Sequence, residues 1–502
     1  MKFILILKII VIAVTQITYA QSWDGAIKIT LGEEEKVFIY TDDRCDVLDL
    51  PDVYAHPIRT PDGIMLVSGN APDNYFMFGE DFNSLKRSCE AVFISGDKWD
   101  ADDFRHQEWI TSVYSEDGIT IHALVHNEYH DPYAENCKPG ITDPSNPCWY
   151  NFISYAKSTD GGRTFIQPES PNHLVAMLPF KWNAAAVDRG SPPPHGYFEP
   201  SNIVKHNGYY YSLMFGILSN TNASVRGTCI MRTDDISAPD SWRIWDGSGF
   251  NIPLINPYAN PPADSSEYLP EFISFRNIRD LRGSLTWNSY LNQFVLVGSG
   301  VHPVDGEETC GFFLSRSDDL INWTKPQLIR ETIFGWQPCH RQTPDQAARN
   351  IVQEAYPSLI DHDAPDISFT YADSTAYLYF MQNMDNWKQG GWGLRRDLVR
   401  IPLTIEKVNP SNVEKRNEPK SQILVSPNPA SEYIEINLDR WTPPSRWSPS
   451  EIKIFNTLGE CVLTALRQAQ GTDYARIDIS HLPVGLYSIT IGNYVEKFMV
   501  VR

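Results

Sequence analysis

Carboxylates stand just before several predicted β-strands of this 502-residue chain, where side chains from different strands can meet. Glu199 lies between a phenylalanine and a proline, and such an apolar setting removes water from a carboxyl group and raises its pKa toward that of a general acid. Asp52 precedes the strand that we predict from His56, and Glu108 precedes the one from Trp109. Carboxyl groups placed in this way can transfer protons to and from a substrate.

Three residues of one predicted strand, His126, Glu128 and His130, share a face and raise the question of a metal site. On a strand that rises ~3.3 Å per residue, the two histidines are ~13 Å apart, too far for two bonds of ~2 Å to one ion. A metal site would require the strand to end at Tyr129, and we expect none. We interpret His126 and Glu128 as a hydrogen-bonded pair within the sheet or as residues that contact a substrate.

An irregular repeat organises the strands that carry these residues. Each copy has a strand, a turn with Gly, Asn or Asp, and a second strand rich in Tyr, Leu, Phe and Val. The five copies begin at His56, Trp109, Glu199, Gly283 and Tyr356. Their spacing of roughly 50 to 90 residues exceeds a WD40 repeat and is typical of four-stranded blades with inserted loops. We therefore predict an all-β fold in which residues 22–405 form a β-propeller, and we expect five blades.

The innermost strand of each propeller blade faces the central axis, so polar residues that open these strands converge on one cavity. We expect the carboxylates of Asp52, Glu108 and Glu199 to lie there as candidate catalytic groups. The candidate substrate-binding residues near the same cavity are His56, Trp109, His126, Glu128 and Arg282.

Three turns after the repeat pairs share a second motif. It occurs at Ser158–Phe165, Arg232–Trp242 and Ser315–Trp323. These turns resemble the Asp-box of sialidase-like and other propeller hydrolases. We interpret Asp160, Asp234 and Asp318 as side chains that cap backbone N–H groups in tight hairpins, each followed by an aromatic plug. The motif therefore supports a propeller fold, and we do not interpret these aspartates as catalytic residues.

The placement of carboxylates across residues 45–405 resembles the five-bladed propeller glycoside hydrolases, a group that includes arabinanases, xylosidases and fructosidases. The resemblance implies that Glu199 is a general acid, Asp52 a base or nucleophile, and Glu108 a carboxylate that tunes the acid. Those families have Asp directly before Pro on the first blade, whereas this chain reads Pro-Asp-Val-Tyr-Ala-His-Pro, so Asp49 is a rival to Asp52. Two carboxylates suffice to hydrolyse a poly- or oligosaccharide.

Two other functions remain open. A non-catalytic propeller would bind glycans through Trp and Tyr side chains in the same cavity and release no sugar. A sialidase-like hydrolase with more blades would need three arginines converging on a substrate carboxylate, together with a Tyr and Glu nucleophile pair. Arg276, Arg279 and Arg282 precede the fourth repeat, but no Arg-Ile-Pro motif occurs near the first. Arg396 is predicted to lie on the closing strand.

The first 20 residues have the pattern of a cleaved signal peptide, in which Lys2 precedes an apolar run from Phe3 to Val14 that Lys8 interrupts. The run is shorter than the ~20 residues that a membrane span needs, so an uncleaved anchor is the less favoured alternative. Eight cysteines fit an oxidising destination. Cys137 and Cys148 bracket a loop rich in Pro, Gly, Asn and Asp, and we predict that they form a local disulfide. The other cysteines allow several pairings.

The chain changes character near residue 405. Residues 406–422 are charged and poor in apolar side chains, which predicts a linker, and residues 423–502 contain short alternating strands that predict a small antiparallel β-sandwich. The motifs Ser426–Ser431, Ile452–Gly459 and Ile477–Tyr487 resemble the C-terminal sorting domain of the bacterial type IX secretion system. The resemblance implies that this secretion machinery is a partner, and that the protein is secreted or at the cell surface of a Gram-negative bacterium.

Composition and missing motifs narrow the remaining functions. The chain has 62 Asp and Glu against 42 Lys and Arg, a net charge of −20, which argues against nucleic-acid binding. No segment after the signal peptide is long and apolar enough to cross a bilayer, so we expect no transmembrane span. The sequence has no P-loop, dinucleotide fingerprint or Gly-x-Ser-x-Gly elbow, so we expect no nucleotide cofactor.

Overall fold

The computed structural model contains two compact units, Met1–Pro410 and Ser411–Arg502, and each is described by itself. The residues described are 25–96, 98, 100–130, 149–182, 195–219, 225–334, 339, 343–385, 393–408, 424–437, 451–456, 461–466, 474–491 and 494–502. The predicted signal peptide and the predicted Cys137–Cys148 disulfide lie outside these residues.

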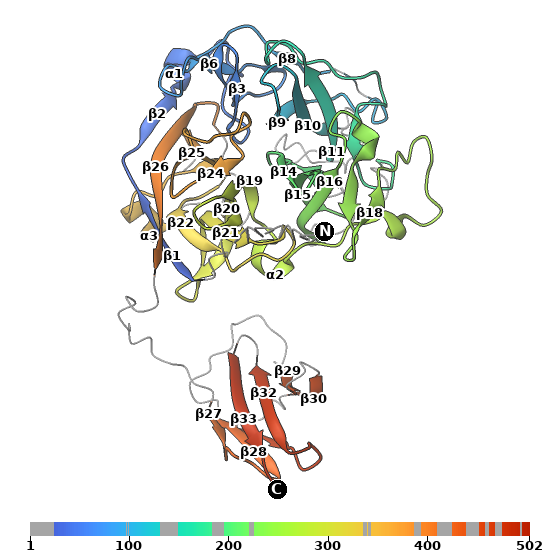
Figure 1. Cartoon of the computed structure of the whole chain (residues 1–502), viewed down its shortest axis with the longest axis vertical. Coiled ribbons are helices and arrows are strands. Elements are labelled where there is room, and N and C mark those ends of the chain that lie inside the picture. Colours follow the sequence, from blue (N-terminus) through green and yellow to red (C-terminus); the bar gives the residue numbers. More distant parts are fainter. Residues whose placement is uncertain are drawn as a thin grey trace, which may run out of the picture. The chain divides into compact units, whose positions relative to one another are not determined.

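In the first unit, antiparallel sheets stand around a central axis as the blades of a β-propeller (Figure 1). We divide the ten-stranded sheet at its parallel β11–β13 pairing, leave the β5–β8 pair aside, and number the resulting groups of described strands blades 1 to 5 in chain order. Blade 1 contains β3 (His56–Thr60), β4 (Gly63–Val67), β6 (Met77–Gly79) and β7 (Lys86–Arg87). Blade 2 contains β9 (Glu108–Tyr114), β10 (Ile121–His130), β11 (Trp149–Ser158) and β12 (Leu174–Ala176).

Blades 3 and 4 continue the same pattern. Blade 3 contains β13 (His195–Phe198), β14 (Val204–His206), β15 (Tyr209–Ile217), β16 (Arg226–Thr233), β17 (Arg243–Trp245) and β18 (Phe250–Pro253). Blade 4 contains β19 (Arg282–Asn288), β20 (Gln293–Val304), β21 (Glu307–Ser317) and β22 (Gln327–Glu331). A short parallel pairing of β11 with β13 joins blades 2 and 3 into one sheet.

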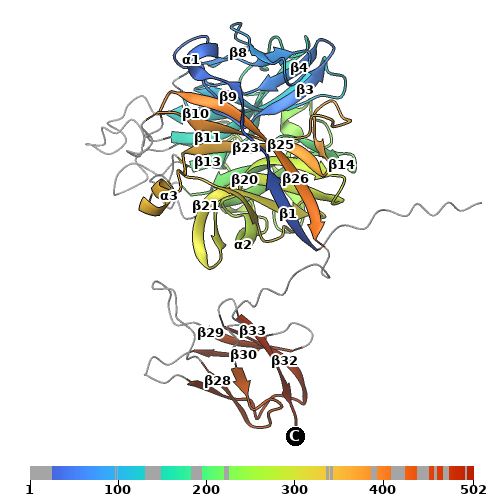
Figure 2. The same cartoon turned by 90° about the vertical axis from the view of Figure 1, so that its left-hand side faces the viewer.

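Blade 5 combines both ends of the unit. It contains β23 (Glu354–Ile360), β25 (Thr375–Asn383), β26 (Arg396–Val408), β1 (Ala26–Leu31) and β2 (Glu35–Phe38). The first strand β1 pairs along β26, which closes the ring (Figure 2). Because Glu406, Lys407 and Val408 pair with β1, the sheet extends three residues into the predicted linker.

Short elements lie in the connections between these strands. They are α1 (Tyr40–Asp43), β5 (Asp73–Asn74), β8 (Phe93–Ile94), η3 (Pro239–Ser241), η4 (Ser265–Tyr268), α2 (Phe275–Ile278), α3 (Pro344–Ala348) and β24 (Tyr371–Ala372). Among the residues described, no helix is both long and apolar enough to cross a membrane.

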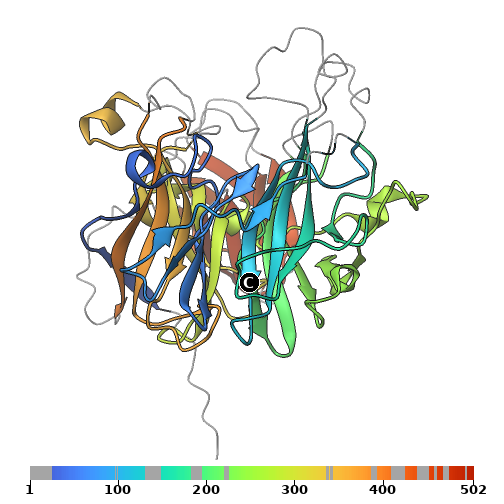
Figure 3. The ribbon, with the colours of Figure 1, turned by 90° about the horizontal axis from the view of Figure 1, so that it is seen from above.

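Apolar side chains fill the spaces between neighbouring blades. Ile58 and Val67 of blade 1, for example, share a buried cluster with Ile110 and Val125 of blade 2. Seen edge-on, the blue strands of blade 1, the cyan strands of blade 2 and the orange strands of blade 5 stand side by side (Figure 3). Since successive strand residues face opposite sides, each blade packs against both of its neighbours.

The turns with the second sequence motif are hairpins capped by carboxylates. Asp160 accepts the N–H groups of Arg163 and Thr164, both at 3.0 Å. In the other two turns the capping residues are Asp235 and Asp319, and not Asp234 and Asp318 as predicted. The difference arises because the capping carboxylate follows a hydroxyl residue by two positions, as in Ser158-Thr159-Asp160, Thr233-Asp234-Asp235 and Ser317-Asp318-Asp319.

A buried ion pair braces the loop that leads into β3. The Asp49 carboxylate contacts the Arg87 guanidinium at 3.2 Å with both side chains at most 1% exposed, and it accepts the Cys45 N–H at 2.9 Å. Burial raises the pKa of Asp49, and the Arg87 charge opposes this shift. A disulfide between Cys45 and Cys89 fixes the same loop. Because the Asp49 side chain is enclosed, a substrate cannot reach it, and Asp49 is a poorer candidate for the catalytic carboxylate than Asp52.

The second unit contains two antiparallel sheets around one apolar core. One sheet has β27 (Leu424–Ser426), β28 (Tyr433–Asn437) and β31 (Tyr474–Asp478), and the other has β30 (Cys461–Leu466), β29 (Glu451–Phe455), β32 (Gly485–Ile491) and β33 (Tyr494–Val500). Buried Ile434 and Ile477 of the first sheet pack in one cluster with Ile454 and Phe498 of the second. The two sheets therefore face each other across this core.

Among the described residues, some cysteines form disulfides and others are free thiols. A second disulfide joins Cys310 and Cys339. Cys229 is a buried free thiol, and Cys461 of the second unit is an exposed one.

The buried ion pair predicts a large effect on stability. Replacing Arg87 by Met leaves the Asp49 carboxylate buried without its partner, so the free energy of unfolding should fall by about 3–5 kcal/mol, measured by urea denaturation. Lys28→Met is the matched control, because the Lys28–Glu406 pair is more than half exposed and should contribute about 1 kcal/mol or less. Equal losses in the two variants would contradict this prediction.

Candidate active site

Asp52 lies in the segment just before β3, and two side chains from blade 5 hold it. The Tyr356 hydroxyl donates a hydrogen bond to Asp52 Oδ1 at 3.2 Å, and the Arg396 guanidinium forms an ion pair with the same oxygen. The Asp52 side chain remains 20% exposed. The pKa of Asp52 is raised above its ordinary value: burial raises it most, the Arg396 charge and the Tyr356 hydrogen bond oppose this shift, and the nearby carboxylates of Glu128 and Glu199 add to it.

Glu199 occupies a break in the first strand of blade 3. β13 and β14 both pair with β15, and Glu199 lies between them with φ = +42°. Tyr356 has the same left-handed backbone, φ = +58°, at an irregularity of the β23 register between Ala355 and Ser358. A β-bulge or a break redirects a side chain out of the regular alternation. Both residues precede a Pro-Ser dipeptide, so the same left-handed backbone conformation occurs at the same point of two repeats.

Two tyrosines connect the Glu199 and Asp52 carboxylates. The Tyr54 hydroxyl donates to Glu199 Oε2 at 3.3 Å, and the Tyr54 ring meets the Tyr356 ring edge-on at 5.5 Å. Tyr356 in turn donates to Asp52. Blades 1, 3 and 5 therefore bring these groups into one cluster.

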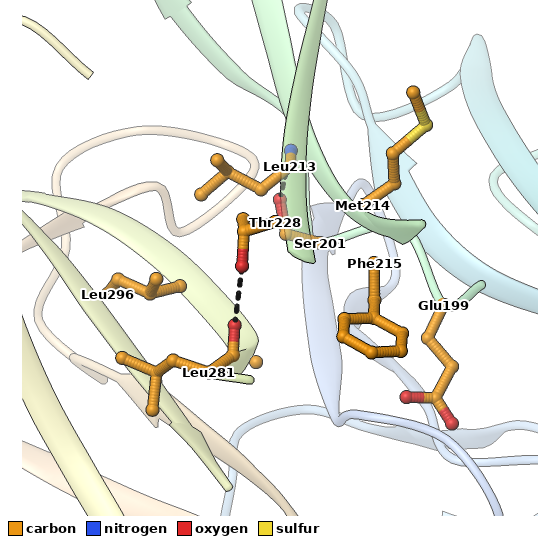
Figure 4. A pocket seen from close by; sticks show the side chains of 9 residues that line it. Glu199, Ser201, Leu213, Met214, Phe215, Thr228, Leu281 and Leu296 are labelled. Carbon is orange, nitrogen blue, oxygen red and sulfur yellow. Dashed lines mark hydrogen bonds between the residues drawn. The ribbon is translucent and has the colours of Figure 1, made fainter. Parts of the chain in front are cut away.

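Glu199 also lines a small cavity between blades 3 and 4. Figure 4 shows its carboxylate beside the Phe215 ring, with Ser201, Leu213 and Leu281 around the cavity. The volume of about 10 Å³ is close to what one water molecule requires.

Glu128 is the third carboxylate of the cluster, and two histidines hold it. His126 Nε2 lies 3.2 Å from Oε1 and His130 Nε2 lies 3.0 Å from Oε2. Burial raises the pKa of Glu128, but the hydrogen bonds from the two histidines outweigh burial and bring the pKa down to about 2. Glu128 is therefore an anion at all ordinary pH values.

A metal site at His126, Glu128 and His130 would require β10 to end at Tyr129, and it does not. The strand continues through His130, which pairs with Trp149. The two histidines enclose the Glu128 carboxylate, and no group of three His, Cys, Asp or Glu side chains in the described residues is arranged to hold a metal ion.

Glu108 lies apart from the cluster. It is fully buried, and its carboxylate accepts hydrogen bonds from the Gly96 N–H at 2.7 Å and the Gln167 amide at 2.8 Å. Burial raises its pKa. A sugar cannot contact a carboxylate without exposed surface. Residues 108 and 109 face opposite sides of β9, so the Glu108 and Trp109 side chains cannot both point toward the central axis.

The predicted binding residues on blades 1 and 2 are more enclosed than the sequence suggests. His56 is 4% exposed, and burial lowers its pKa to about 3. Trp109 is 9% exposed, donates its indole N–H to Asn70 at 2.7 Å and packs 5.8 Å from the His126 ring. Arg282 opens β19, but its side chain lies outside the description.

Tyr54, Tyr356 and Arg396 are the site residues that sequence reasoning missed. The one available signal was the repeated X-Pro-Ser segment, which places Tyr356 at the same point of its repeat as Glu199. Arg276 and Arg279, proposed for a sialidase-like site, are exposed at and after α2, and Arg279 pairs with Asp280 at 2.7 Å.

Residues 424–501 match the family model described as a secretion system C-terminal sorting domain. The second unit is therefore a sorting domain, and the protein is secreted or at the cell surface. A search of curated proteins finds no match.

Solved structures similar to the chain share little sequence with it. A candidate glycoside hydrolase from Parabacteroides distasonis is 15% identical, with 56% of this chain and 63% of that one covered and a TM-score of 0.27. An N-acetylgalactosamine deacetylase from F. plautii is 10% identical (75% and 95%, TM-score 0.37), and the Cellvibrio cellulosa α-L-arabinanase is 12% identical (70% and 90%, TM-score 0.33). These similarities are too distant to indicate an activity. The propeller fold is assigned from the strand pairing described above.

The Glu128 contacts predict a pH-dependent contribution to stability. Folding lowers the pKa of Glu128 from 4.5 to about 2, so the stabilisation is fully present above pH 4.5 and is lost as the pH falls toward 2. Relative to Glu128→Gln, the wild type should be more stable by about 2–3 kcal/mol at pH 6, and this difference should shrink below pH 4.5. Urea titrations across this range measure it, and a difference that does not change with pH would refute the assignment.

Proposed function

We propose that the propeller hydrolyses glycosidic bonds of a poly- or oligosaccharide, with Glu199 as general acid and Asp52 as base or nucleophile. The observation that carries the proposal is the linked pair of carboxylates from blades 1 and 3, joined through Tyr54 and Tyr356. One carboxyl group protonates the leaving oxygen, and the other activates water or attacks the anomeric carbon.

Asp52 is suited to the second role because only one of its oxygens is engaged. Tyr356 and Arg396 both bind Oδ1, and Oδ2 has no hydrogen-bond partner among the residues described. The two partners fix the orientation of the carboxylate, and the Arg396 charge favours its ionised form. Oδ2 is then the atom that would attack carbon or take a proton from water.

Glu199 is suited to the first role because this residue is partly exposed and belongs to the cluster. Its carboxylate lies at the edge of the small cavity beside Phe215 (Figure 4).

We assign Glu128 an electrostatic role, which differs from the acid-tuning role that the resemblance implied for Glu108. Because its pKa is about 2, it cannot serve as an acid at ordinary pH. A fixed negative charge near the reacting carbon would stabilise the oxocarbenium-like transition state of glycoside hydrolysis.

Substitution of the proposed acid tests the assignment. Glu199→Gln should lower kcat/KM by about 10²–10⁴-fold on natural glycans while the protein stays folded, since the proton donor is lost. Reducing-sugar release from a panel of polysaccharides and aryl glycosides measures the rate, and circular dichroism checks the fold. Glu169→Gln, at an exposed residue, is the control and should be fully active.

Two outcomes would overturn the proposal in different ways. Full activity of Glu199→Gln would remove Glu199 from the reaction. Retention of a glycan by the wild type without release of sugar would favour the non-catalytic binding propeller.

A nucleophile or base should respond differently from an acid. Asp52→Asn should lower kcat/KM by more than about 10³-fold whatever the leaving group, because attack at carbon or activation of water is needed for every substrate. Aryl glycosides with good and poor leaving groups measure this. A variant that loses activity only on poor leaving groups would identify Asp52 as the acid.

A further inference from the structure

His126 lies between the Glu128 carboxylate and the backbone of Glu199. Its Nε2 is 3.2 Å from Glu128 Oε1, and the Glu199 N–H points to its Nδ1 at 3.4 Å. The His126 side chain is only 6% exposed, so solvent does not compete freely for these contacts. One imidazole thus touches the proposed acid and its charged neighbour.

The two contacts define the position of the ring proton. A nitrogen that accepts an N–H bond carries no hydrogen, so Nδ1 is bare. A carboxylate only accepts, so the hydrogen sits on Nε2 and is donated to Glu128. These contacts select the Nε2–H form of His126, in which Nδ1 can receive the Glu199 amide.

Aromatic packing holds the ring in this orientation. Phe198 stacks on the His126 ring at 6.1 Å, and Trp109 lies 5.8 Å away on a tilted plane. Trp109 is itself anchored by its hydrogen bond to Asn70. These neighbouring rings limit rotation of the imidazole.

The Glu199 backbone needs such support. It has φ = +42°, a conformation that residues with a side chain adopt rarely, and it lies in a break between β13 and β14, where the sheet ladder does not hold it. The His126 contact engages the N–H of this residue. Loss of that contact would let the backbone relax and would move the carboxylate.

We propose that His126 is a positioning residue for Glu199: it holds the backbone of the acid through Nδ1 while Glu128 holds its tautomer through Nε2. This inference rests on the proposed acid role of Glu199. It assigns His126 a place in proton delivery to the leaving group and not a direct contact with the sugar.

Two amide substitutions separate the two sides of the imidazole. In His126→Asn, the amide oxygen takes the place of Nδ1 and keeps an acceptor for the Glu199 N–H. In His126→Gln, the amide nitrogen takes the place of Nε2 and keeps a donor for Glu128, but the Nδ1 acceptor is lost. His122→Gln, on the same strand and bonded to Tyr155 at 2.7 Å, is the matched control.

The readout is kcat/KM on glycosides with poor and good leaving groups. A phenyl glycoside needs a well-placed acid, whereas a dinitrophenyl glycoside departs without one. His126→Gln should lose about 10- to 100-fold on the phenyl glycoside and less than about 3-fold on the dinitrophenyl glycoside. His126→Asn should lose less than His126→Gln on the phenyl glycoside, and His122→Gln should match the wild type.

Other results would overturn the inference. Equal losses on both leaving groups would indicate a purely structural role, and a more active Gln than Asn variant would assign His126 to Glu128 alone. A wild type that hydrolyses no glycoside would overturn the proposed function instead. In that case ¹⁵N NMR of labelled histidines, assigned with His126→Asn, still decides: the Nε2–H tautomer at neutral pH supports the geometry, and an Nδ1–H or doubly protonated ring refutes it.

Discussion

The pairing of β1 with β26 closes the ring, and the central cluster depends on this closure. Arg396 opens β26, and Tyr356 lies on β23 of the same blade, yet both bind Asp52 ahead of blade 1. Only a closed ring sets the first and last blades side by side. The Asp52–Arg396 ion pair and the β1–β26 pairing therefore depend on each other, since an outward movement of blade 5 would break both.

Two residues of the cluster have a strained backbone. Glu199 and Tyr356 each hold a left-handed backbone just before a proline, at a cost of about 1–3 kcal/mol per residue. The rest of the propeller offsets this cost through apolar packing between blades. Regular strands would send both side chains into the blade interfaces, whereas the irregular openings turn Glu199 and Tyr356 toward Asp52 and Tyr54.

The repeat in the sequence was enough to predict the all-β propeller and to place Asp52 and Glu199, because strand openings are local features. The orientation of a side chain at such an opening was not predictable, since it changes with each single residue of register, and Glu108 consequently faces the wrong side. Arg396 could not be found because 344 residues separate it from Asp52. The second unit was easier to predict, since its alternating strands and ordered motifs lie within one short stretch.

The topology also sets an order of events. Both described disulfides join residues near each other in the chain, 44 and 29 positions apart, so each can form as soon as its own blade exists. Closure is different: β1 pairs with residues nearly at the end of the unit. Non-local pairing of this kind comes late in folding, and until then β1 and the outer edge of β25 are exposed to pairing with other chains. Until residue 408 has been synthesised, the unit therefore has two strand edges without their final partner.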